Sequence, residues 1–160
     1  MSLLLFIALL LHVNVTLGHE ELKNVAYSKK VTLSSEHSSH LYPGSKAVNG
    51  ILTDFAHTAP EKHPWLIIDL EATYEIHEIE VFARSGCCGY QIHDLDVRVG
   101  SDPHNMKLCG HFTGQASNGQ RIAFWCPFNT KGRYVKLQIM AGQVNKLSPA
   151  EVLVWGLQVY

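Results

Sequence analysis

Short runs of apolar, β-branched and aromatic residues recur along the chain from residue 65 onward. Within Leu95–Val99 and Tyr134–Ile139, apolar and polar residues alternate. A period of two is typical of strands with one buried face. We therefore expect strands at the following ranges: Trp65–Leu70, Ile76–Ala83, Leu95–Val99, Ile122–Trp125, Tyr134–Ile139 and Val152–Val159.

Turn signals separate these runs. They are Pro43-Gly44, Asn49-Gly50, Asp102-Pro103, Asn118-Gly119 and Lys131-Gly132. Such dipeptides mark tight turns, and no segment of useful length has a helical period. Many short strands at this spacing favour an antiparallel β-sandwich or barrel. No repeat or internal linker divides the chain, so we expect one domain.

The first 18 residues have the pattern of a signal peptide. Leu3–Leu11 is an apolar run, and the small residues Thr16 and Gly18 follow it. Nine apolar residues are too few to span a bilayer, and small residues at these positions suit cleavage after Gly18. We predict a signal peptide over 1–18, a mature domain over 19–160, and a secreted, extracellular protein without a membrane span.

Composition excludes two broad classes of protein. The 160 residues include 13 Lys and Arg against 14 Asp and Glu, for a net charge of −1. That balance lacks the positive charge that binds phosphates, so a nucleic-acid partner is not expected. The 46% of hydrophobic residues is ordinary for a globular domain and argues against a disordered chain.

Four cysteines lie beyond the predicted signal peptide: Cys87, Cys88, Cys109 and Cys126. An even number in an oxidising compartment implies two disulfides. Four cysteines allow three pairings, and spacing does not decide among them. A bridge between the neighbours Cys87 and Cys88 would strain the intervening peptide, which persists only where the surroundings enforce it.

Catalytic motifs are missing from the sequence. It contains no GxSxG, HExxH, P-loop or GxGxxG pattern. The nine histidines beyond the signal peptide do not cluster at metal-ligand spacing. We therefore do not expect an enzyme, although a hydrolase or metal enzyme with a dispersed site remains an alternative.

Two segments carry candidate binding chemistry. In Ala47–His57, Asn49 and Asp54 offer hard oxygen ligands beside a turn, which is the chemistry that calcium prefers. In Arg84–Gln91, a cation ends a predicted strand and meets a loop rich in glycine and cysteine. Binding residues often lie on loops at strand ends.

With these segments in view, the chain resembles the F-type lectin (fucolectin) family of fucose-binding domains over nearly all of its mature part. The adjacent cysteines with a correctly spaced His57 and Arg84 are the most specific landmark. The other landmarks follow in order: Asn24-Val25-Ala26, Ala47–Gly50, Pro64-Trp65, Ile68–Leu70, Cys109, Cys126, Gly132–Val135 and Glu151-Val152.

The resemblance implies a discoidin-like β-sandwich jelly roll of about eight main strands, with bridges Cys87–Cys88 and Cys109–Cys126. It implies a shallow pocket for terminal L-fucose on glycoconjugates, in which basic side chains hydrogen-bond the sugar. Carried over, the sugar-binding residues are His57, Arg84, Gln91, Cys87 and Cys88. A structural calcium ion would be held by Lys46, Asn49, Ile51, Asp54, Ala150 and Glu151.

The sequence departs from the family pattern in the sugar pocket, at a third disulfide, and in the calcium loop, where Asn49 replaces the typical Asp. Gly86 stands where the family has Asp, and Gln91 stands where it has a basic residue. Phe55 and Ala150 occupy the positions of a third disulfide. We expect a calcium-stabilised lectin of innate defence or adhesion, with weakened or altered specificity. The alternative is a protein-binding adhesion module on the same fold that has lost sugar binding. The oligomeric state, including a homo-oligomer, is left open.

Overall fold

The protein is an all-β domain, as predicted. The computed structural model describes residues 20–38 and 40–160, so the expected signal peptide lies outside the described residues. Two short 3-10 helices, η1 (Gly44–Val48) and η2 (Gly89–Gln91), accompany the strands. The strands are β1 (Lys23–Asn24), β2 (Lys30–Leu33), β3 (Trp65–Ala83), β4 (His93–Asp102), β5 (Asn105–Gln115), β6 (Arg121–Trp125), β7 (Lys131–Ile139) and β8 (Pro149–Gln158).

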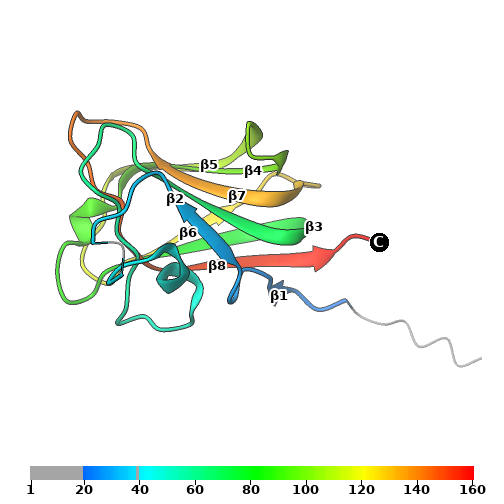
Figure 1. The fold of residues 1–160 in the computed structure, drawn as a ribbon. Helices are drawn as coiled ribbons and strands as arrows, with labels where there is room; N and C mark the ends of the chain where they lie inside the picture. Colours follow the sequence, from blue (N-terminus) through cyan, green and yellow to red (C-terminus); the bar gives the residue numbers. More distant parts are fainter. Residues whose placement is uncertain (1–19, 39) are drawn as a thin grey trace, which may run out of the picture.

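Strand β3 links the two layers of the fold (Figure 1). Its first part, Trp65–Asp69, pairs antiparallel with β2 and β7, and β7 continues to β4 and β5. Its last part, Glu78–Phe82, pairs with β6 and β8, and β8 continues to β1. The strand thus runs from one end of the molecule to the other and returns in the opposite layer.

The sequence predicted the two halves of β3 as separate strands, and the structure joins them through a bend. Glu71 there has a φ of 68°, and the pairing with β7 shifts register between Asp69 and Tyr74. The prediction stopped at Leu70 because the run of mostly apolar residues ends at the polar Glu71. The prediction also missed β5, an edge strand with mostly exposed or half-buried side chains that leave no hydrophobic period.

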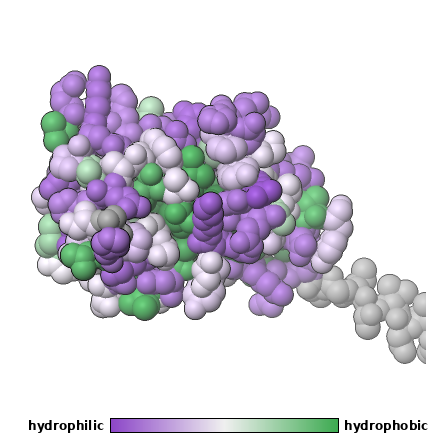
Figure 2. Space-filling model, viewed as in Figure 1, coloured by the Kyte–Doolittle hydropathy of each residue, from purple (hydrophilic) through white to green (hydrophobic). Residues whose placement is uncertain are grey.

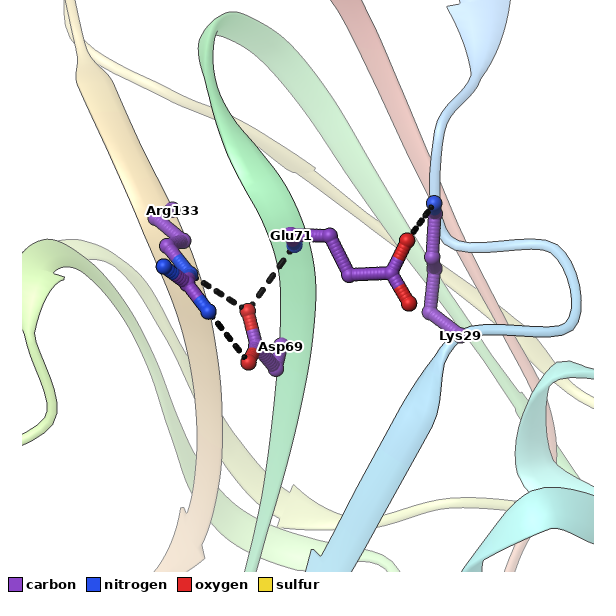
Figure 3. A network of polar contacts seen from close by, with 4 residues as sticks. All are labelled: Lys29, Asp69, Glu71 and Arg133. Carbon is purple, nitrogen blue, oxygen red and sulfur yellow. Dashed lines mark hydrogen bonds and ion pairs between the residues drawn. The ribbon is translucent and has the colours of Figure 1, made fainter.

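An ionic network fixes this bend (Figure 3). Arg133 on β7 donates from Nε to Asp69 Oδ1 at 2.7 Å and from a terminal nitrogen to Oδ2 at 2.9 Å. The backbone N–H of Glu71 donates to the same Oδ1 at 2.8 Å, and the Glu71 carboxylate pairs with Lys29. We call these four residues the bend clamp. The bidentate bond lowers the pKa of Asp69, so the carboxylate stays charged.

The core lies between the layers. Val135, Leu137 and Ile139 are all 0% exposed, which confirms the alternation predicted for this strand. The connections 34–64, 84–92 and 140–148 gather at one end of the sandwich, which we call the loop end, away from the C-terminus (Figure 1). The bend of β3 and the pairing of β1 with the end of β8 lie at the far end.

Candidate functional site

The disulfide turn lies at the loop end. Cys87 bonds to Cys88, and Cys109 bonds to Cys126, which settles the three pairings that spacing left open. Cys88 has a φ of 66°, a left-handed conformation that starts the tight turn η2. The turn follows Arg84 at the end of β3, so the sandwich fixes where this cation and the adjacent bridge emerge.

Phe55 is the centre of an aromatic cluster under Arg84. The guanidinium of Arg84 lies over the Phe55 ring, 3.6 Å from Cζ to the centroid. Tyr42 stacks on Phe55 with centroids 4.7 Å apart, and the rings of His37 and His57 lie 4.6 Å apart. Phe55 therefore does more than fill the place of a lost disulfide: it supports the cation that the sequence singled out.

The positively charged guanidinium of Arg84 has no carboxylate partner among the described residues. Among residues 20–38 and 40–160, its guanidinium makes no hydrogen bond or ion pair, and burial lowers its pKa without discharging it at neutral pH. It borders a hollow of about 100 Å³, the Arg84 hollow, lined by Leu52, Thr53, Asp54, Phe55, Arg84, Ser85, Gly86 and Cys87. The N–H groups of the planar Arg84 guanidinium can reach a ligand in this hollow.

His57 lies beneath the same surface and is 5% exposed. Its Nδ1 lies 2.7 Å from the Thr58 carbonyl oxygen, which can only accept, so Nδ1 carries the hydrogen and Nε2 is the acceptor. Burial lowers the pKa of His57 despite that bond, and the charges of Arg84 and Lys146 act in the same direction. A neutral imidazole of this tautomer can accept a hydroxyl hydrogen.

The Gln91 side chain is less accessible to a ligand than the sequence suggested. Its side chain is buried, and its amide oxygen accepts from the Ser148 hydroxyl. It borders a second hollow of about 360 Å³, the Lys146 hollow, lined by Tyr90, Gln91, His93, Gln115, Val144, Asn145 and Lys146. Arg84 and Cys87 thus line one hollow beside the turn, and Gln91 lines the other.

The predicted calcium ligands gather beneath the loop end around Glu151. This carboxylate is 1% exposed, and Oε2 accepts from the Gly50 N–H at 3.0 Å. Oε1 is buried without a partner among the described residues. Burial raises the pKa of Glu151 to about 7, although hydrogen bonds from the backbone N–H groups of Asn49, Gly50 and Ile51 act to lower it. A buried carboxylate oxygen without a donor fits a cation.

The other predicted ligands form a loop that is already partly bonded. Asn49 donates from Nδ2 to Asp54 at 3.3 Å and accepts the Ile51 N–H on Oδ1 at 2.9 Å. The Lys46 ammonium lies 2.9 Å from Asp54 Oδ1. Burial opposes ionisation of Asp54, but the bonds from Lys46 and the Phe55 N–H lower its pKa. No three His, Cys, Asp or Glu side chains in the described part of the chain form a metal cluster, so backbone carbonyls would have to supply ligands.

Sequence reasoning missed Tyr42, Phe55 and Lys146 as site residues. Phe55 had been noted only as a substitute for cysteine, and Lys146 follows Phe55 by more than ninety positions. Only the fold brings the 140–148 loop to the disulfide turn.

The surface of the loop end is mixed rather than uniformly polar. Leu41, Leu52, Tyr90 and Val144 are 58%, 51%, 56% and 75% exposed. Figure 2, seen from the same side as Figure 1, shows hydrophobic side chains interspersed with hydrophilic ones there. No helix of the described residues is long and apolar enough to cross a membrane. Such a surface offers apolar contacts and hydrogen-bonding groups side by side, as saccharides require.

Comparisons with known proteins give the family and the fold of the chain. The sequence pattern of the NedA-like, galactose-binding domain family matches residues 46–137. A pentraxin fusion protein of Xenopus laevis is 27% identical over 142 residues, which are 83% of this chain and 33% of that protein. A fucolectin of Anguilla anguilla is 28% identical over 143 residues, covering 81% of this chain and 90% of the relative.

The solved structure of an F-lectin (fucolectin) from the serum of Morone saxatilis, striped bass, superposes with a TM-score of 0.78 at 23% identity. The match covers 86% of this chain and 50% of that one, which confirms the β-sandwich fold. This chain thus spans a third to a half of two of these proteins and most of the third. The family is one of carbohydrate-binding domains rather than enzymes. The chain is similar to fucolectins, and it belongs to the NedA-like, galactose-binding domain family.

Proposed function

We propose that the protein is a secreted lectin that binds terminal L-fucose on glycoconjugates at the loop end. The observation that carries this proposal is the grouping of His57 and Arg84 around Phe55 beside the Cys87–Cys88 bridge. Arg84 supplies charged donors, and His57 Nε2 supplies an acceptor, for neighbouring ring hydroxyls. The disulfide offers an apolar wall for the methyl group of a deoxy sugar.

Gln91 contributes more weakly. With its oxygen bonded to Ser148, its amide N–H group has no acceptor among the described residues and faces the Lys146 hollow. A neutral amide donor contributes about 0.5–1.5 kcal/mol, against about 1.5–3 kcal/mol for a charged one. The site is therefore weaker toward neutral sugars than one with two basic residues. Attachment to a multivalent surface would compensate.

The experiment is a glycan array probed with the protein in calcium, with free L-fucose as competitor. Signal on fucosylated glycans that L-fucose removes, but D-galactose does not, would support the proposal. Signal that L-fucose leaves unchanged would contradict the sugar assignment. Complete silence at high protein density would favour the protein-binding alternative.

We also propose that calcium stabilises the loop end. Carboxylates of Asp54 and Glu151, the Asn49 amide oxygen, and the carbonyls of Lys46, Ile51 and Ala150 would hold the ion. A bound cation would fix the connection that carries Phe55 and His57.

A ligand at a hundred times its Kd stabilises the folded state by roughly 2.7 kcal/mol. Millimolar calcium should therefore raise Tm over EDTA, and magnesium should not. The response should vanish in Glu151→Gln, and an unchanged response in that variant would exclude this site.

A specific observation favours the second candidate, a protein-binding module. At the far end Trp125 and Phe128 are 73% and 97% exposed, and such exposed aromatics are enriched at protein interfaces. Replacing both with serine should leave glycan binding intact if the loop end is the sugar site. The same variant should abolish partner binding if this face is the functional one.

A further inference from the structure

Arg84 and Lys146 are loop-end cations without an ion-pair partner among the described residues, as is the exposed Lys62. Arg84 stacks on Phe55 and makes no ion pair, as described above. Lys146 is half-buried, and its ammonium has no hydrogen-bond or ion-pair partner within the described ranges. Two carboxylates of this end already have basic partners: Asp54 pairs with Lys46, and Asp94 lies 3.0 Å from His93.

Lys146 is held at a fixed place rather than on a free loop. Its neighbour Asn145 exchanges backbone hydrogen bonds with Glu61 at 2.8 and 2.9 Å. The side chain of Asn145 meets His93 Nε2 at 3.1 Å and donates to the Ala141 carbonyl at 2.9 Å. The following Leu147 donates its N–H to Thr58 at 2.9 Å and is fully buried. Both sides of Lys146 are thus anchored, so its stem leaves the surface at a defined point.

Space for an anion exists beside the other cation. Gly86 is exposed, and a Cβ added there would meet no atom within 4 Å. Where the family resemblance predicts a carboxylate, this chain has open space on the wall of the Arg84 hollow. Arg84 therefore lacks the one side chain that would have neutralised it locally.

The two hollows meet the same short turn. Cys87 lines the Arg84 hollow, and Tyr90 and Gln91 line the Lys146 hollow, four positions later at most. His57, buried between, feels both charges, because Arg84 and Lys146 each lower its pKa. Since His57 is neutral at pH 7, it adds no positive charge to those of Arg84 and Lys146.

We propose that this loop end takes an acidic saccharide, with Arg84 and Lys146 engaging a carboxylate or sulfate and the rest of the glycan lying across the Cys87–Gln91 turn. This inference rests on the proposed function, because it names the substituent that the same site selects. Exposed Tyr90 provides a face on which a sugar ring can stack. An anionic group of the ligand takes the place of the carboxylate that the family pattern has at position 86.

The test measures binding to three immobilised oligosaccharides that share a terminal fucose: a neutral one, its sulfated form and its sialylated form. An added charge-assisted hydrogen bond should make an acidic form bind about tenfold tighter than the neutral parent. The sulfate and carboxylate arms identify which anion is preferred. Raising the salt concentration should reduce the preference, because exposed charges are screened.

Variants separate the contributions. Lys146→Gln should remove the preference for the acidic form while leaving binding to the neutral form. Gly86→Asp, which the open space accommodates, should abolish the preference by pairing with Arg84. Lys131→Gln, an exposed cation at the far end, is the matched control and should change nothing.

Each outcome has a distinct meaning. Equal binding of neutral and acidic forms, unaltered in Lys146→Gln, would overturn this inference and leave the proposed fucose lectin standing. Acidic glycans bound equally well with and without fucose, and by Gly86→Asp, would indicate nonspecific attraction and also overturn it. No binding to any of the three would overturn the proposed function itself.

Discussion

An arginine at each end of the sandwich has a different kind of partner. At the far end Arg133 is held by both oxygens of Asp69, within a clamp that fixes the bend of β3. At the loop end Arg84 lies on the face of Phe55 and has no carboxylate. The first arrangement uses the cation to hold the backbone, and the second leaves its donors for a ligand. The pairing of a charge, rather than its presence, distinguishes a structural arginine from a binding one.

Removing the unpaired cation should have the largest effect on binding. Arg84→Gln should weaken binding of a fucosylated glycan roughly 10- to 100-fold, because a charged donor contributes about 1.5–3 kcal/mol. Tm should fall by no more than a few degrees, since the contact with Phe55 is lost but no ion pair is. Isothermal titration and thermal unfolding measure the two quantities. A large drop in Tm with unchanged affinity would reverse the roles assigned to the two arginines.

Phe55 tests how the loop end holds its cation without a carboxylate. Phe55→Leu keeps an apolar side chain of similar size but removes the ring face under Arg84. A cation–π contact contributes about 0.5–2 kcal/mol, so affinity should fall roughly 2- to 30-fold. Phe55→Tyr keeps the ring and serves as the control. Equal affinities for the leucine and tyrosine variants would show that the ring does not position Arg84.

The far-end arginine should show the complementary phenotype. Arg133→Gln breaks the bidentate bond to Asp69, so we expect Tm to fall by a few degrees and glycan affinity to change less than about twofold. Lys107→Gln, a surface change on the edge strand, controls for lost charge. A loss of affinity in Arg133→Gln at unchanged Tm would remove the distinction between the ends.

The smallest effect concerns pH. The pKa of His57 is lowered from 6.5 in the folded protein, so between the two values the unfolded chain binds more protons. Stability is therefore complete above pH 6.5 and declines as pH falls below it toward the folded value. His57→Gln should flatten this decline in a series of Tm measurements between pH 5 and 8. Parallel curves for both proteins would contradict the burial of a neutral imidazole.

The sequence predicted the fold and much of the site, for identifiable reasons. Alternation in Tyr134–Ile139 reports directly which face is buried, and the spacing of His57, Arg84 and the cysteine pair is short-range information. The partnership of Arg133 with Asp69 could not be read, because it joins residues 64 positions apart. Lys146 was beyond reach for the same reason, since only the sheet register brings its loop to the disulfide turn.

The position of Gln91 shows a different limit. Its place in the motif was known, but the orientation of its side chain depends on a hydrogen bond from the buried hydroxyl of Ser148. No local sequence pattern indicates that bond. A sequence motif fixes where a residue lies along the chain. The contacts of the fold decide which of its atoms a ligand can reach.

The most direct test of the account is an NMR titration of the isotopically labelled protein with a sulfated, fucosylated oligosaccharide. The account predicts saturable shifts of backbone amides within residues 55–57, 84–91 and 144–146, and none around Trp125 and Phe128. Shifts confined to the far end, or none at saturating ligand, would contradict the claim that the unpaired cations of the loop end form the saccharide site.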